Sequence, residues 1–241
     1  MLTKMIGVET RLFFREPGVW LLTILLPTIV LVVVGSIFGA KPDPLLGGRP
    51  WIQIFAPSLV VMSLAILGVN TLPARLVKYR EKGVMRRLST TPASPRSLLI
   101  AQLAVNMGVA VGSLVVLVVV GNVVLQIPFP KDMLGFGVAF LLGMSALFAL
   151  GLLVAAVAPT AGIASALFVP LFALVMFLGG VYLPRQMLPD LLIRVGDYTP
   201  PGIQALLDAW SGTSPQLAQL AAMGVITILA GAAAVRRFRW E

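Results

Sequence analysis

The stretch LGFGVAFLLGMSALFALGLLVAAVA, residues 134–158, is an uncharged apolar run of 25 residues. A helix of this length covers the hydrocarbon core of a bilayer, which is about 30 Å thick. Five more uncharged apolar runs of 19 to 23 residues lie before and after it: residues 19–39, 52–72, 98–120, 163–183 and 217–235. The sequence therefore predicts an all-α membrane protein with six transmembrane helices.

The Lys and Arg residues are unevenly distributed among the segments between these spans. Six spans place both termini on the same side of the membrane. That side holds 13 of the 18 Lys and Arg residues, in the N-terminus, the loop 73–97 and the C-terminal tail. Because segments rich in Lys and Arg stay in the cytoplasm, we expect both termini to be cytoplasmic. Nucleic-acid binding is not expected, because the charge follows the topology and not one continuous face.

The composition excludes several classes of protein. No segment between the spans exceeds 33 residues, so we expect residues 1–241 to form a single transmembrane domain. The chain has no Cys and no His, and its spans contain no ionisable residue that could bind a driving ion. No Lys is followed by Ser or Thr, so the phosphate-binding motif G-x-x-x-x-G-K-[ST] is absent. We therefore expect no enzyme activity and no bound cofactor; if ATP drives this protein, another chain binds it.

The loop PARLVKYREKGVMRRLSTTPASPRS, residues 73–97, is the most informative polar segment. Seven of its 25 residues are Lys or Arg. Residues 72–79 have the composition to continue the second span as a helix until Gly83 interrupts it, and residues 84–88 resemble a short helix that ends at Ser and Pro. This order is typical of a docking element. The alternative, that these charges only set the topology, remains open.

Two further segments outside the spans have amphipathic patterns. Residues 1–17 predict a helix in the membrane interface, although Glu9 and Glu16 fall on its apolar side, so that a partner in the loop 73–97 or a shorter helix is expected. Residues 184–216 contain two short apolar runs, 187–193 and 203–210, which are too short to cross a membrane. They predict short helices before the last span, with an ordinary surface loop as the alternative.

The spans offer few candidates for a substrate site. Aromatic, Met and amide side chains at helical spacing in spans two and five would suit a bulky amphipathic molecule, although each could equally pack against lipid or another helix. The candidates are Phe55, Met62, Asn70, Phe168, Phe172, Met176 and Phe177. Two Gly-x-x-x-Gly pairs, Gly35 with Gly39 and Gly108 with Gly112, predict close helix packing.

Three segments together resemble one family of membrane proteins. They are EKGVMRRLSTTPASPRSLLIAQL (81–103), FFREPGVWLLTILLPTIVLVVVGSIFG (13–39) and GGVYLPRQMLPDLLIRVGDYTPP (179–201). Their order and spacing resemble the bacterial type 2 ABC exporter permeases, which include daunorubicin-resistance-like exporters. The resemblance covers most of the chain. It implies a multi-pass protein of the bacterial cell (inner) membrane, in which residues 184–216 form short external re-entrant helices.

The resemblance also implies partners and a coupling site. Two copies of this chain, or two related permeases, would associate with two separate ABC ATPase subunits that bind ATP and Mg. The loop 73–97 would hold the coupling helix, although Met85 departs from the commoner pattern. The residues expected to contact the ATPase are Glu81, Gly83, Arg86, Arg87, Leu88 and Pro92.

The expected function is that of a permease subunit of an ATP-driven exporter, with no catalytic residue of its own. Its substrate would be a lipophilic or amphipathic small molecule, such as a drug, an antibiotic or a lipid, so that multidrug efflux and antibiotic resistance are included. Two alternatives remain: export of a lipid-linked glycan or peptide, and a structural or regulatory membrane subunit that transports nothing.

Overall fold

A computed structural model describes residues 2–38, 50–84, 87, 95–182 and 187–237. Within these ranges the regular elements are helices, and six of them are long and apolar enough to cross a membrane. The prediction of an all-α protein with six spans is confirmed. The spans run over Pro17–Phe38, Trp51–Glu81, Ser97–Leu125, Met133–Val157, Ala161–Leu178 and Leu217–Arg237.

The helices that build these spans differ in regularity. The first span combines α2 (Pro17–Trp20), the π-helical η1 (Leu21–Leu25) and α3 (Leu26–Phe38). The second span combines α4 (Trp51–Ala65), the π-helical η3 (Ile66–Thr71) and α5 (Leu72–Glu81). The other elements are α1 (Leu2–Arg15), α7 (Pro95–Leu125), α8 (Met133–Val157), α9 (Ala161–Leu178), α10 (Asp190–Tyr198), α11 (Ile203–Ser211) and α12 (Leu217–Arg237).

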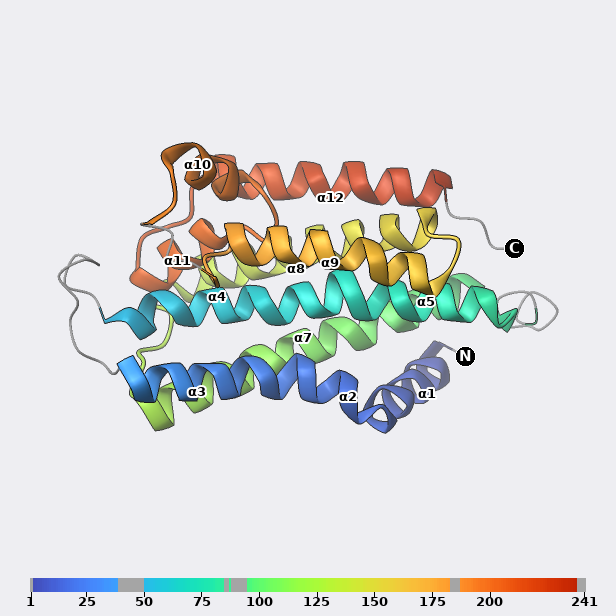
Figure 1. Ribbon diagram of the computed structural model, residues 1–241, viewed down its shortest axis with the longest axis horizontal. Coiled ribbons are helices and arrows are strands. Elements are labelled where there is room, and N and C mark those ends of the chain that lie inside the picture. Colours follow the sequence, from blue (N-terminus) through green and yellow to red (C-terminus); the bar gives the residue numbers. More distant parts are fainter. Residues whose placement is uncertain (1, 39–49, 85–86, 88–94, 183–186, 238–241) are drawn as a thin grey trace.

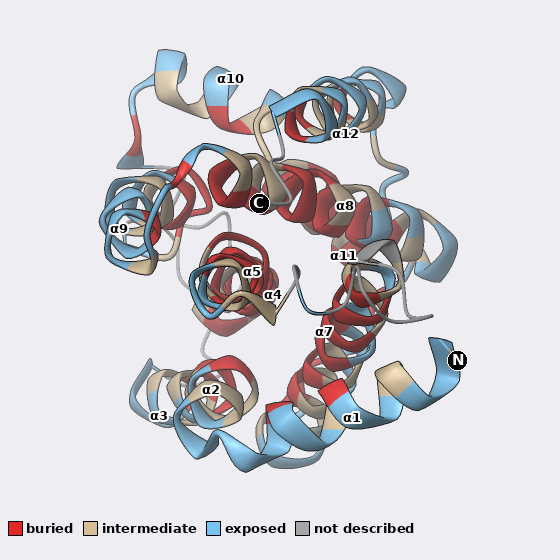
Figure 2. Cartoon of the chain, turned by 90° about the vertical axis from the view of Figure 1, so that its right-hand side faces the viewer, coloured by how far each residue is buried: buried red, intermediate tan, exposed pale blue. Residues whose placement is uncertain are grey.

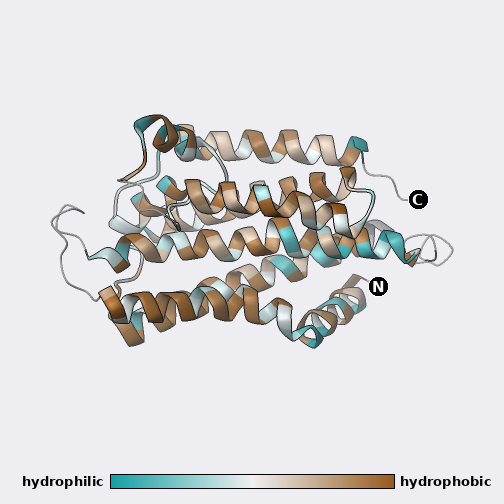
Figure 3. Ribbon diagram, in the orientation of Figure 1, coloured by the Kyte–Doolittle hydropathy of each residue, from teal (hydrophilic) through white to brown (hydrophobic). Residues whose placement is uncertain are grey.

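The long helices run side by side along the long axis of the molecule (Figure 1). One end of this bundle carries α1, the end of α5, the turn between α8 and α9, and the end of α12. We call it the basic end, because α1, α5 and α12 carry eight of the described Lys and Arg residues, and Lys82 and Arg87 follow α5. At the opposite end, which carries α10 and α11, the described cations are Lys131 and Arg194. In Figure 3 the polar residues accordingly gather at the ends of the bundle, and apolar residues fill its length.

The second span forms the centre of the bundle. In its most apolar window 83% of the residues are buried, against 61% or less in every other span. Figure 2 shows α4 and α5 surrounded by the first span, α7, α8 and α9, with their exposed faces turned outward. Large apolar side chains such as Val169 on α9, which is 64% exposed, cover those outer faces. Apolar outer faces are what lipid requires of a spanning helix.

Several helix limits differ from the expected ones. α5 continues the second span to Glu81, as predicted from the loop sequence. α9 ends at Leu178 and not at residue 183, because Gly179 and Gly180 follow it and Gly180 adopts a left-handed φ of 71°. α10 begins at Asp190 and not at residue 187, since Pro189 precedes its first turn. It ends at Tyr198 and not at residue 193.

Glycine allows two spans to cross closely at Gly68 in η3 and Gly151 in α8. A Cβ atom on Gly151 would overlap the carbonyl oxygen of Gly68 and lie 2.9 Å from its carbonyl carbon. The predicted packing at Gly35 is also observed, because a Cβ there would meet Leu125 and Ile52. The packing prediction is wrong within this chain for Gly108 and Gly112, which have no atom within 4 Å of an added Cβ.

Candidate functional site

The coupling residues predicted from the sequence lie where α5 ends. Gly83 has a φ of 64°, a conformation that glycine adopts without steric cost and that lets the chain leave the helix. The amide of Arg87 donates a hydrogen bond of 3.1 Å to the carbonyl oxygen of Gly83, and Val84 and Arg87 are both helical. Glu81, Gly83 and Arg87 are exposed or partly exposed at the basic end. The other three coupling residues, Arg86, Leu88 and Pro92, lie outside the described residues.

The last two residues of α5 bind the turn between α8 and α9. The Glu81 carboxylate accepts a hydrogen bond of 2.8 Å from the amide of Ala161, the first residue of α9. The Arg80 guanidinium donates to the carbonyl oxygens of Ala155, over 3.1 Å, and of Ala158. The first amides and the last carbonyl groups of a helix have no partner within the helix. The negative charge of Glu81 at the start of α9 and the positive charge of Arg80 at the end of α8 also complement the helix dipoles. We call Arg80 and Glu81 the α5 clamp.

A buried polar cluster holds α1 against α5 and α7. Glu9 is only 4% exposed. The hydroxyl of Tyr79 lies 3.0 Å from each oxygen of the Glu9 carboxylate, and the side-chain amide of Gln102 also donates to it. Asn106 donates in turn to the carbonyl oxygen of Gln102 over 2.8 Å. We call Glu9, Tyr79, Gln102 and Asn106 the Glu9 cluster. The sequence pattern did not predict that the last three residues would belong to it.

An ion pair fixes the turn between α1 and α2. Arg75 Nη2 lies 3.1 Å from Glu16 Oε2, and its guanidinium lies over the ring of Phe13 at 5.1 Å from the centroid. Glu16 therefore meets a cation of the loop 73–97, as predicted. Glu9 differs from the prediction in that its hydrogen-bond partners, Tyr79 and Gln102, are uncharged.

Burial raises the pKa of the Glu9 carboxyl above its ordinary value of 4.5. The hydrogen bond from Tyr79 and the charge of Arg75 act in the opposite direction, and the negative charge of Glu16 adds to the rise. A carboxyl whose pKa is raised in the folded state stabilises that state most at low pH. This contribution is complete below about pH 4.5 and is lost as the pH rises through the raised pKa.

Replacing Glu9 with glutamine should reduce the pH dependence of the folding stability. The variant keeps an oxygen that accepts from Tyr79 but has no proton to lose, so Glu9→Gln is expected to raise the melting temperature at pH 7 relative to the native chain and to change it little at pH 4.5. The measurement is thermal unfolding in detergent between pH 4.5 and 8, with Glu241→Gln as a control that removes a carboxylate elsewhere. Parallel pH curves for the native chain and Glu9→Gln would contradict this assignment.

The residues predicted for a substrate path lie on two neighbouring helices of the bundle. Phe55 and Met176 are buried in the core, while Met62, Asn70 and Phe177 are partly exposed. Phe168 and Phe172 are also partly exposed, and their ring centroids are 4.9 Å apart on α9. α9 contacts both α4 and η3, so the two groups of candidates lie on neighbouring spans. Phe55 and Met176 are thus closed to a passing molecule in this conformation.

Comparisons with known proteins agree with the pattern of helices. The model of the family "ABC-2 type transporter" matches residues 3–201. The chain is similar to the protein named "Putative transport permease YvfS" of Bacillus subtilis (strain 168), with 27% identity over 156 residues; this match covers 63% of the chain and 62% of the relative, which is less than two thirds of its length. No solved structure matches at a significant level. With a family match over most of its length and six apolar helices, the chain is a multi-pass membrane protein that belongs to the ABC-2 type transporter family.

Proposed function

We propose that this chain is the permease subunit of a bacterial ABC exporter of the daunorubicin-resistance-like type. A separate ABC ATPase would bind ATP and Mg and drive it, and two permeases would assemble with two ATPase subunits. The observation that carries the proposal is the family match over residues 3–201, which includes the loop 73–97. The substrate would be a lipophilic or amphipathic small molecule, because the partly exposed candidates on α4, η3 and α9 are aromatic, Met and amide side chains.

The proposed orientation places the basic end in the cytoplasm. The described Lys and Arg residues are concentrated there, and an excess of Lys and Arg marks cytoplasmic segments. An ATPase in the cytoplasm would then meet the loop after α5, and α10 and α11 would lie at the outer end of the path. α11 packs against α8 and α4 and buries Ile203, Leu206 and Trp210. This burial favours a fixed cap over a surface loop.

The α5 clamp supplies a route for coupling. A force applied to the loop after Glu81 acts on the end of α5, to which the α8–α9 turn is hydrogen-bonded through Arg80 and Glu81. Since α9 carries Phe168, Phe172 and Met176, a shift of this turn would change the distance between α9 and α4. In this proposal Glu81 serves inside the permease, and the ATPase is contacted by the residues that follow Gly83.

The purified chain is expected to hydrolyse no ATP, whereas co-expression with its ABC ATPase should give a co-purifying complex. Inside-out vesicles that contain the complex should accumulate a fluorescent amphipathic drug only when ATP is added. Vesicles with an ATPase that lacks its catalytic glutamate are the control. ATP turnover by the chain alone would contradict the proposal, as would ATP-independent accumulation or failure to bind any ABC ATPase of the same organism.

A further inference from the structure

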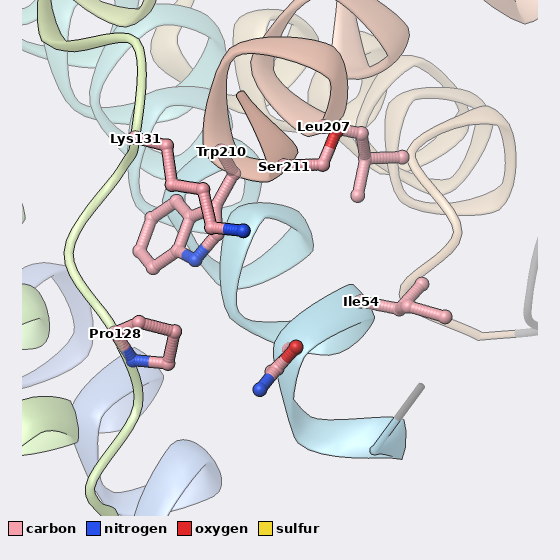
Figure 4. Close-up of a pocket in the computed structure, with 7 residues that line it drawn as sticks. Ile54, Pro128, Lys131, Leu207, Trp210 and Ser211 are labelled. Carbon is pink, nitrogen blue, oxygen red and sulfur yellow. The ribbon is translucent and has the colours of Figure 1, made fainter. Parts of the chain in front are cut away.

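A pocket of about 250 Å³ lies at the end of the bundle opposite the basic end (Figure 4). Three segments that are distant in sequence form it: the start of α4, the connection between α7 and α8, and the end of α11. Its lining residues are Gln53, Ile54, Pro128, Lys131, Leu207, Trp210 and Ser211. Neither the α5 clamp nor the predicted substrate path uses them.

The indole of Trp210 is fixed in place but lacks a hydrogen-bond partner. Trp210 is only 6% exposed, and its ring meets the edge of Phe136 with the centroids 5.5 Å apart. The amide of Asp132 donates to the carbonyl oxygen of Ala209 over 3.0 Å and joins the α7–α8 connection to the end of α11. Trp210 Nε1 is buried without a partner, and in Figure 4 it faces the pocket. A buried N–H group without an acceptor is costly and calls for an explanation.

Lys131 brings a positive charge to the same pocket. A Cβ on Gly212 would lie 3.1 Å from Lys131 Cβ and 3.2 Å from Lys131 Cδ, so the glycine leaves room for the lysine stem against the end of α11. The ammonium group extends toward the pocket in Figure 4. The neighbouring carboxylates have other hydrogen bonds: Asp132 accepts from the amide of Gly135 over 2.9 Å, and Asp208 accepts from Gln204 over 2.7 Å.

The two nitrogen groups that face the pocket can only donate hydrogen bonds. An ammonium and an indole N–H cannot satisfy each other, so an acceptor placed between them would bind both. Gln53 adds a side-chain amide that can donate or accept, while Ile54, Pro128 and Leu207 provide an apolar wall that strengthens a charged hydrogen bond. The volume is smaller than that of pockets for drug-sized molecules, which begin at about 300 Å³. It suits a single polar headgroup.

We infer that this pocket binds a phosphate group, held by Lys131 Nζ and Trp210 Nε1. The phosphate could come from a free anion or from the headgroup of an anionic lipid, because both present the same charged oxygens. Binding would supply the acceptor that Trp210 lacks and a counter-charge for Lys131. The inference does not depend on what the protein transports or on how it is driven.

The test uses the full chain in an uncharged maltoside detergent. Trp20, Trp51 and Trp240 are replaced with phenylalanine so that Trp210 is the only fluorescent tryptophan. One arm titrates inorganic phosphate at constant ionic strength, and the other titrates dioctanoyl phosphatidylglycerol against dioctanoylglycerol, which has no phosphate. A saturable change in Trp210 emission is expected in at least one arm. A response to inorganic phosphate alone identifies a free anion, and one to the lipid alone identifies a headgroup.

Substitutions decide whether the pocket causes the response. Lys131→Gln is expected to raise the apparent Kd at least tenfold, while Lys131→Arg keeps the charge and most of the affinity. Trp210→Phe keeps an aromatic side chain but removes the indole N–H, and in the native background it should reduce the rise in melting temperature that the ligand produces. Arg194→Gln, which removes the other described cation at this end, is the control and should change nothing. The inference is overturned if neither ligand gives a saturable response, or if Lys131→Gln and Trp210→Phe bind as the native chain does.

Discussion

Replacing Gly151 with alanine is expected to prevent the chain from accumulating as a folded membrane protein. The added methyl group would overlap the carbonyl oxygen of Gly68 in η3, and this atom belongs to a helix backbone that no side-chain rotation can move. α8 and η3 would have to separate, with loss of the packing around the central span. Overpacking in a core costs roughly 1–3 kcal/mol and sometimes more. Because the clash is with backbone, we expect a loss of about 3 kcal/mol or more, a large part of a typical folding free energy of about 5–15 kcal/mol.

Gly137 provides a matched control on the same helix. A Cβ on Gly137 meets no atom within 4 Å, so Gly137→Ala is expected to be neutral or to stabilise α8 by about 0.5–1 kcal/mol. The measurements are the yield of monodisperse protein in detergent and its melting temperature. Equal yields and equal melting temperatures for the two variants would contradict the close approach of Gly151 to the backbone of Gly68.

The elements that depend on local composition could be predicted from the sequence. An uncharged apolar run of about 20 residues has few ways to satisfy its backbone other than a spanning helix, and so the six spans were recognised. The extension of span two through Arg75 and Lys78 was also predicted, because these residues favour helix and Gly83 interrupts it. The exact helix limits were harder to predict. α9 ends at Leu178 because two glycines follow it, although the apolar run continues to residue 183.

Contacts between distant segments could not be predicted. The Glu9 cluster joins residues 70 and 93 positions apart, and nothing in the pattern of α1 identifies Tyr79 and Gln102 as its partners. The glycine spacing shows the same limit. Gly108 and Gly112 have the spacing of a packing motif but face open space within this chain, whereas the close crossing is made by Gly68 and Gly151. Spacing tells which residues share a helix face, but not which helix lies opposite.

For the same reason, the candidate site could be predicted from the sequence only in part. The charge pattern of residues 73–97 predicted a docking element, which stays a prediction, and a cation of this loop as the partner of Glu16, which in the structure is Arg75. The pattern did not distinguish Arg80 from its basic neighbours, although the structure separates it by its hydrogen bonds to Ala155 and Ala158. The sequence pattern placed Trp210 only at the end of the apolar run 203–210. Its unpartnered N–H group becomes apparent once α11 is packed against α8.

Reversing the charges of Arg86 and Arg87 to glutamate is expected to abolish export and to weaken co-purification of the ATPase. Arg87 is exposed one helical turn after Gly83, beyond the α5 clamp, where a partner at the basic end would meet it. Arg86 lies outside the described residues and is included for its charge. Replacing attraction with like-charge repulsion at an interface costs on the order of several kcal/mol. Membrane insertion should persist, because eleven of the 13 cations that set the topology remain.

The same reversal at Arg237 and Arg239 in the C-terminal tail is the matched control, since it changes the net charge equally but leaves the loop after α5 intact. Export is measured in inside-out vesicles, ATPase binding by co-purification, and insertion by the amount of chain in the membrane fraction. If Arg86→Glu with Arg87→Glu retains full export and a bound ATPase, these arginines serve only as topology signals. The coupling surface would then have to lie on α1, which the Glu9 cluster joins to the same end of α5 and to α7.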